Sequence, residues 1–175
     1  MTIINDLTTL RQFFQEATQA VSGIDLFRGV SNGEEGVQEI QHLFETEIKA
    51  GQVVCLYQVA ETPITDNGAG YSKAVFACTL MVLKKMPSAK INFDMKLQAR
   101  DEIWKKTLKL IGKIKLAADW FTSNYTELQD EAYDVQFSIF QDRILPIGKI
   151  ANANVQGWLV DIDISIPVNK LLYGQ

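Results

Sequence analysis

The first apolar pattern along the chain is that of an amphipathic helix. Asn5 or Asp6 can cap this helix, and the Ser22-Gly23 pair is expected to end it. Its apolar residues recur every three or four positions: Leu7, Leu10, Phe13, Phe14, Ala17 and Val21. The glycine-rich segment that follows, anchored by Ile24, Leu26 and Phe27, is expected to be a loop or a short strand.

A second amphipathic helix is predicted after Ser31 or Asn32, either of which can cap it, and before Gly51. Its predicted apolar face is formed by Val37, Ile40, Phe44 and Ile48. Glutamates fill the remaining positions: Glu34, Glu35, Glu39, Glu45 and Glu47. The segment 33–48 therefore presents an acidic face, which is either solvated or a surface for a partner.

Two strands follow, at residues 52–60 and 72–85, both rich in β-branched and aromatic residues. They are joined by the turn-rich segment 61–70 and are expected to pair as an antiparallel hairpin. Both strands are apolar on both faces, so both faces need cover. We expect helices of this chain to cover one face and a neighbouring subunit to cover the other.

The longest predicted helix starts at Asn92 or Asp94 and runs to Trp120 or Phe121. Its apolar residues form two stripes, a wider arc than contact with a single sheet requires. Gly112 lies in the middle of the helix, where glycine costs about 1 kcal/mol relative to alanine, and close packing would explain it. The same segment holds the densest group of cations: Lys105, Lys106, Lys109, Lys113 and Lys115.

The last third of the chain predicts two more strands. Residues 133–140 alternate between apolar and polar positions, and residues 158–167 alternate even more regularly. Trp158 and the isoleucines of the second strand share one face, whereas Asp161 and Asp163 lie on the other. The segment 141–157, with Pro146, is expected to be a long connection, and 123–132 an exposed connector.

Together these elements predict an α+β fold. Its sheet is mainly antiparallel and four-stranded, formed from two hairpins, with the long helix packed on one face and two N-terminal helices. The chain is expected to form a single domain over residues 1–175. Within it, residues 1–50 form a helical part, 51–167 the sheet with the long helix, and 168–175 a C-terminal tail.

Composition narrows the possible functions. The chain has 175 residues, 47% hydrophobic and 22% charged, which is the balance of a globular domain. A net charge of −4 argues against a dedicated nucleic-acid-binding protein. The N-terminus lacks the pattern of a signal peptide, and no apolar run has the length of a membrane span. A protein made and kept in a cytoplasm is the expectation.

Few residues suggest catalysis. His42 is the one histidine, and no G-x-S-x-G or phosphate-loop pattern is present. Cys55 and Cys78 lie in apolar runs and are expected to be reduced core residues, with a disulfide between paired strands as the alternative. From the single histidine, the missing motifs and the position of the cysteines, we predict no catalytic, cofactor-binding or metal-binding residue.

The strongest enzyme hypothesis concerns carboxylates. Asp161 and Asp163 share a strand face, and Asp134 would join them if strand 133–140 pairs alongside. Three acids on one face suit Mg²⁺ or Mn²⁺ in phosphoryl transfer. The alternative is a solvated polar face that protects an edge hairpin against aggregation.

The segment LPIGKIANANVQGWLVDIDISIP (145–167) resembles the closing segment of tail terminator, tail completion and head-to-tail joining proteins of tailed bacteriophages. The shared features are the Pro146-Ile147-Gly148 turn, Asn152 and Asn154 in the following loop, and Gly157-Trp158 at the start of an alternating last strand. The order of hairpin, long helix and hairpin is also similar to that of these proteins.

The resemblance implies a non-enzymatic, ring-forming subunit of a virion, at the head–tail junction or the tail end, assembled in the cytoplasm of a host bacterium. Its partners would be copies of itself and other neck or tail proteins, with no membrane, and DNA only as it passes through the ring. We expect the hairpin 52–83 and the loop 141–157 to form the interface. The predicted interface residues are Tyr57, Phe76, Met81, Trp104, Ile147, Asn152, Asn154 and Trp158.

Two other hypotheses stay open at this point. One is a small binding or regulatory module that uses the acidic helix 33–48. The other is the metal-dependent phosphoryl-transfer enzyme built on Asp134, Asp161 and Asp163.

Overall fold

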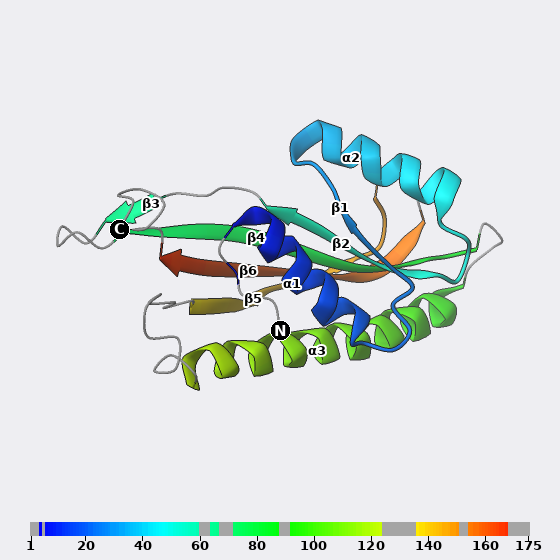
Figure 1. The fold of residues 1–175 in the computed structure, drawn as a ribbon. Helices are drawn as coiled ribbons and strands as arrows, with labels where there is room; N and C mark the ends of the chain where they lie inside the picture. The colour runs from blue at the N-terminus through cyan, green and yellow to red at the C-terminus, as the bar shows by residue number, and fades with distance from the viewer. Residues whose placement is uncertain are drawn as a thin grey trace.

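The fold, obtained as a computed structural model, is α+β, as the sequence predicts: a mixed sheet lies between helices on its two faces (Figure 1). The structure describes residue 4 and residues 6–59, 64–66, 72–87, 92–123, 136–150 and 154–167. The sheet has the strand order β1-β2-β4-β6-β5, and β3 pairs with β4 outside this path. The connector 124–135 and the tail 168–175 lie outside the described residues.

Helix α1 (Leu7–Gln19) begins at Asp6, as predicted. The Asp6 carboxylate accepts a hydrogen bond from the Thr9 amide at 2.7 Å, and the Asp6 amide donates to Thr9 Oγ1 at 3.0 Å. This capping box satisfies backbone groups that a helix end leaves without partners. The helix buries Leu10, Phe13 and Phe14 against the sheet, whereas Leu7 stays exposed.

The predicted four-stranded, two-hairpin sheet is wrong in its strand number. Residues Leu26–Gly29 form strand β1, which pairs in parallel with β2 (Val53–Val59) and makes one edge of the sheet. A four-residue strand carries too little alternation to be told from a loop, and its parallel partner lies far along the chain. Ile64–Asp66 forms another short strand, β3, within the predicted connection 61–70.

The centre of the sheet follows the predicted pattern closely. Strand β4 (Ser72–Lys85) has the predicted bounds and pairs antiparallel with β2, as expected for the first hairpin. On its other side β4 pairs antiparallel with β6 (Val155–Pro167) over the length of both strands. This long β4–β6 pairing joins the two predicted hairpins into one sheet.

The predicted connection 141–157 is largely strand. Strand β5 (Gln136–Ile147) continues past a register shift between Ile139 and Ile144, and β6 begins at Val155. The irregularity interrupts the alternation that would have revealed a continuing strand. Pro146 is tolerated because β5 is an edge strand, where a missing amide donor leaves no ladder bond unmade.

Helix α3 (Phe93–Ser123) runs along one face of the sheet, with Asn92 Oδ1 accepting a hydrogen bond from the Met95 amide at 2.9 Å. This face, which we call the closed face, carries the main core, formed with α1 and α3. From α3 the core takes Ile103, Leu110 and Ile114, and from the sheet it takes Cys55, Phe76, Val160 and Ile162.

The other face, which we call the half-open face, is covered at one end by α2 (Gly33–His42) and the π-helical turn η1 (Leu43–Glu47). Ile40, Phe44 and Ile48 pack there on Val54, Leu56 and Leu83. The expectation that a neighbouring subunit covers this end of the hairpin is therefore wrong, because the chain's own second helix does so. Val37, predicted for the apolar face, points outward and is 48% exposed.

Candidate functional site

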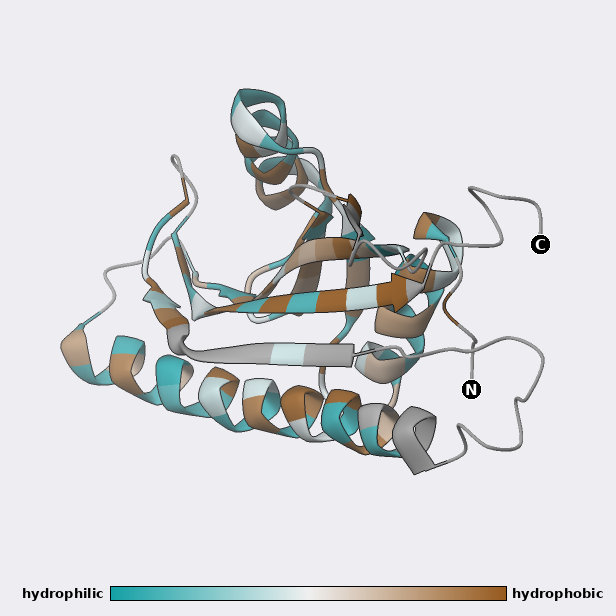
Figure 2. Ribbon diagram, turned by 90° about the vertical axis from the view of Figure 1, so that its left-hand side faces the viewer, coloured by the Kyte–Doolittle hydropathy of each residue, from teal (hydrophilic) through white to brown (hydrophobic). Residues whose placement is uncertain are grey.

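The outer face of α3 carries several apolar side chains that the described part of the chain leaves exposed. Most of the exposed large hydrophobic side chains in the described part of the chain lie on this helix: Phe93, Met95, Leu97, Leu108 and Leu116. Figure 2 shows apolar and polar segments alternating along it. Because the opposite side of α3 already packs on the sheet, these residues have no role in the main core.

Lysines surround the apolar residues on this helix. Residues 104–116 contain five lysines and no acid. Lys105 forms an ion pair with Asp101 at 2.8 Å, and Lys106 with Glu102 at 3.5 Å. Within the described residues no ion pair is found for Lys109, Lys113 or Lys115.

Gly112 lies on the same outer face, one turn from both Leu108 and Leu116. A β-carbon built at Gly112 would meet no atom within 4 Å other than those of its own helix and chain neighbours. Close packing inside the described part of the chain, the predicted reason for this glycine, is therefore excluded. Glycine weakens a helix relative to alanine, and no contact within the described residues requires a glycine at this position.

The outer face of α2 and η1 has the opposite charge. Residues 33–47 contain five glutamates, no lysine and no arginine, and all five glutamate side chains are exposed. Glu34 and Glu35 lie in the first turn of α2, where negative charge is favourable. The exposed Val37 lies one turn away from Glu34, so this face also carries an apolar side chain.

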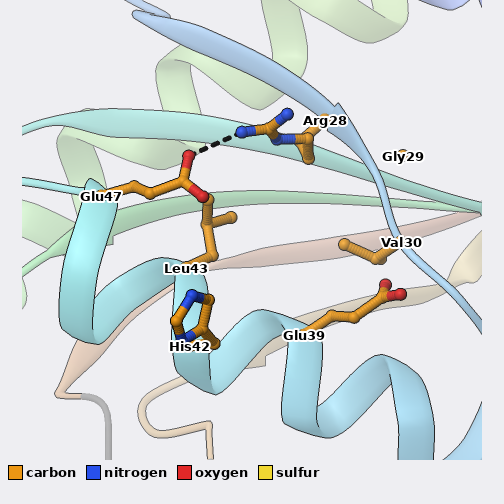
Figure 3. Close-up of a pocket in the computed structure, with 7 residues that line it drawn as sticks. All are labelled: Arg28, Gly29, Val30, Glu39, His42, Leu43 and Glu47. Atoms are coloured by element: carbon orange, nitrogen blue, oxygen red, sulfur yellow. Dashed lines mark hydrogen bonds and ion pairs between the residues drawn. The ribbon is translucent and has the colours of Figure 1, made fainter.

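A groove of about 290 Å³ lies between β1 and α2 (Figure 3). Arg28 and Glu47 close one end of it with an ion pair at 2.6 Å. Glu39 accepts hydrogen bonds from the Ser31 amide at 2.7 Å and the Ser31 hydroxyl at 2.9 Å, and these bonds lower the pKa of its carboxyl. Both acids therefore hold the strand–helix connection in place.

His42 lies on the wall of this groove, projecting from the end of α2 (Figure 3). The groove's lining residues include no serine, threonine or cysteine, so nothing on it could serve His42 as a hydroxyl or thiol nucleophile. The arrangement offers a small charged depression in which polar groups could bind.

The two cysteines are free thiols in the main core, so the disulfide alternative is not realised. In the β2–β4 register Cys55 faces Val82 and Cys78 faces Val59, so the two are not cross-strand partners. Burial raises the pKa of each thiol to about 12. Both are therefore protonated and unreactive at neutral pH.

Asp161 and Asp163 lie on the half-open face beyond the reach of α2, as the strand alternation predicts. Asp161 accepts a hydrogen bond from Thr79 Oγ1 on β4 at 2.7 Å. Asp134, the third acid of the metal hypothesis, lies outside the described residues. Within the residues that are described, no three potential metal ligands come together.

Two of the predicted interface residues form a tryptophan cluster beside α3. The rings of Trp104 and Trp158 lie 4.6 Å apart, and Trp158 Nε1 donates to the Arg100 carbonyl at 3.1 Å. Arg100 in turn donates to Gln156 Oε1 at 3.1 Å. Both rings are half-buried, and the cluster fastens α3 to the start of β6.

The other predicted interface residues are spread through the molecule. Tyr57 and Phe76 are buried in the main core and Met81 under α2, so the chain itself covers all three. Ile147 is half-buried against the cluster under α2. Asn154 is exposed and directly precedes β6. Asn152 lies outside the described residues.

Sequence reasoning missed two parts of the exposed surface. Leu116 belongs to neither stripe predicted for the long helix, and Val37 is predicted on the core side of its helix. The stripes are Leu97, Trp104, Leu108, Ile111 and Lys115, and Ile103, Leu110, Ile114, Ala117 and Phe121. The signal that could have revealed Leu116 is the spacing of Leu108, Gly112 and Leu116, which places a glycine between two leucines on one helix face.

In the described part of the chain, no helix is both long enough and apolar enough to cross a membrane. A comparison with known protein families finds no match for this sequence, and neither does a comparison with curated proteins.

Proposed function

We propose that the chain is a structural assembly subunit of a phage or phage-like particle, with no enzymatic activity of its own. In this proposal it forms a ring at the head–tail junction or the tail end. The resemblance of residues 145–167 to tail terminator and connector proteins is the reason for proposing a phage or phage-like particle. The exposed surface of the molecule is the reason for proposing that the chain assembles with other copies.

The proposal that the chain assembles with other copies rests on the exposed apolar side chains on the outer face of α3. Phe93, Leu108 and Leu116 are exposed on a helix whose other side already packs on the sheet, and we take this gathering of exposed apolar side chains on one helix as the mark of an interaction site. A second chain would remove this surface from water, which a monomer cannot do.

Multi-angle light scattering on the purified chain tests the assembly. We expect a mass that is a multiple of 19.7 kDa and that rises with concentration. Leu116→Glu should reduce the mass, because it places a charge in the contact. Leu7→Glu is the matched control, since Leu7 on α1 is also an exposed leucine, 54% against 66% for Leu116. A monomer at high concentration, with both variants unchanged, would contradict the assembly.

A separate experiment tests whether the chain is part of a phage or phage-like particle. For this, the chain is expressed in bacteria in which such particles assemble. A tagged copy should sediment with intact particles or with detached tails, and negative-stain microscopy should place the tag at one end of the tail. A tag found only in the soluble fraction would argue against a virion protein while leaving self-assembly untouched.

A second candidate function is a binding module that uses the acidic face of α2 and η1. The observation that favours it is the concentration of five glutamates beside the charged groove of Figure 3. Glu39 and Glu47 are unsuitable test sites because their bonds to Ser31 and Arg28 support the fold. Reversal of Glu34, Glu35 and Glu45 should abolish capture of a basic partner while leaving thermal unfolding unchanged.

A further inference from the structure

The two outer helical faces of the molecule have opposite charge and lie on opposite sides of the sheet. In both Figure 1 and Figure 2, α2 lies above the sheet and α3 below it. Residues 33–47 carry five glutamates and no lysine or arginine, and residues 104–116 carry five lysines without an acid. A second copy of the chain therefore presents the charge that the first one lacks.

The two faces also match in their apolar residues. Val37 is 48% exposed on α2, one turn from Glu34, and Leu108 is 45% exposed on the basic face. Gly112, one turn from Leu108, lets another helix approach the backbone of α3 closely, because no atom of the described residues outside its own helix lies within 4 Å of a β-carbon placed there. An apolar centre with a charged rim is the usual anatomy of a protein interface.

We propose that the acidic face of α2 and η1 in one copy docks on the lysine face of α3 in the next copy. This contact rests on the proposed assembly function and names the surfaces that would build it. Because the two surfaces are different and point in opposite directions, the contact is head-to-tail, and it generates a closed ring or a filament rather than a symmetric dimer.

Charge favours a second copy over nucleic acid as the occupant of the lysine face. The chain has a net charge of −4, and two of the five lysines already pair with Asp101 and Glu102. Three lysines of this face have no ion pair in the described residues: Lys109, Lys113 and Lys115. Their positive charge is opposite to that of the α2 glutamates, which also have no cationic partner in the described residues. An electrostatic contact of this kind weakens as salt screens the charges.

Cysteine trapping tests the geometry directly. The chains Val37→Cys and Leu108→Cys are mixed and oxidised, and the native Cys55 and Cys78 give no background because both are buried. We expect a disulfide-linked dimer in the mixture and none with either variant alone. A chain carrying both substitutions should give a ladder of linked species. Cross-linking of Val37→Cys with itself, or no cross-linking in the mixture, would overturn the proposal.

A charge swap tests the energetics. Glu34→Lys/Glu35→Lys and Lys109→Glu/Lys113→Glu should each weaken self-association by more than about tenfold, because like charges then face each other. An equimolar mixture of the two chains should recover assembly by alternation. The control, Lys149→Glu, reverses an exposed lysine on the β5–β6 connection and should change nothing.

The outcomes separate this contact from the proposed function. If the wild-type chain assembles but neither trapping nor the charge swap affects it, the contact is wrong and the assembly stands. If the chain is monomeric and the mixed cysteine variants do not cross-link, both are wrong. Retention of polyphosphate or DNA by the lysine face, lost in Lys109→Glu/Lys113→Glu while self-association is unchanged, would assign that face to nucleic acid and overturn the contact.

Discussion

The two faces of the sheet are covered in different ways. On the closed face, α1 and α3 lie over strands from both edges, and the buried side chains form one continuous core. On the half-open face, α2 and η1 cover one end, and the remainder presents Thr79, Asp161 and Asp163. The closed face therefore carries most of the apolar burial that stabilises the fold, whereas the half-open face holds its helix with a smaller cluster.

The largest expected effect is on the closed face. Phe14 is fully buried and contacts the rings of Phe13 and Tyr57, with centroids at 5.3 and 5.1 Å. Phe14→Ala should lower the free energy of unfolding by about 3–5 kcal/mol, because it leaves a cavity in the main core. Urea denaturation followed by circular dichroism measures this. Leu7→Ala, at an exposed position of the same helix, should change it by less than about 0.5 kcal/mol.

The same substitution on the half-open face should have a smaller effect. Phe44 is 1% exposed under η1, but the cluster around it is small and α2 can settle onto the gap. We expect Phe44→Ala to lower the free energy of unfolding by about 3 kcal/mol, the low end for phenylalanine. Hydrogen exchange should show faster exchange in 33–47 than in 103–114, already in the wild type. Equal protection of both helices would contradict the difference between the faces.

Sequence patterns predicted the parts of the fold in which one kind of pattern runs uninterrupted. Strand β4 follows from its long run of β-branched and aromatic residues, and the buried face of β6 follows from strict alternation. Of the two caps predicted for each helix, Asp6 caps α1 and Asn92 caps α3. Prediction was incomplete where the decisive interaction is distant or the period is broken. The segment of β1 was left open between a loop and a short strand, and it is a strand because β2 supplies its partner. Only the first part of β5 was predicted, because the register shift between Ile139 and Ile144 interrupts the alternation.

The candidate surfaces were predictable only in part. The acidic helix and the lysine cluster are visible as runs of like charge, but their placement on opposite faces depends on the topology. Val37 faces outward because the buried stripe of this segment is Gly36, Ile40, Leu43 and Phe44, at positions i, i+4, i+7 and i+8. The small Gly36, which packs against the Ser31 carbonyl, takes the place on that stripe that the prediction gave to Val37.

A bond between α3 and the sheet should give a smaller, pH-dependent effect. Lys84 on β4 donates to Glu102 on α3, and this bond lowers the pKa of the Glu102 carboxyl below its ordinary 4.5. A lowered folded-state pKa stabilises the fold above pH 4.5 and loses that contribution as the pH falls through the folded-state value. Because Glu102 is 42% exposed, we expect Glu102→Gln to lower the free energy of unfolding by less than about 1 kcal/mol at neutral pH.

The difference from wild type should shrink to nothing in acid, where Glu102 is protonated in both the folded and unfolded chain. Thermal melts of the two proteins across the acidic range measure this convergence. Glu34→Gln is the control, since Glu34 is exposed and has no ion pair in the described residues. A constant offset at all pH values would mean that packing, rather than the ion pair, is responsible.

The smallest expected effect has the opposite sign and returns to the outer surface of the closed face. Gly112→Ala should stabilise the isolated chain by about 0.5–1 kcal/mol, because alanine is the better helix former and its β-carbon meets no neighbour. If a second copy packs on α3 at this point, the same methyl group should weaken self-association. A raised melting temperature in dilute solution together with a lower mass in light scattering would show that the glycine is kept for a partner. A raised melting temperature with unchanged assembly would place the contact elsewhere on α3.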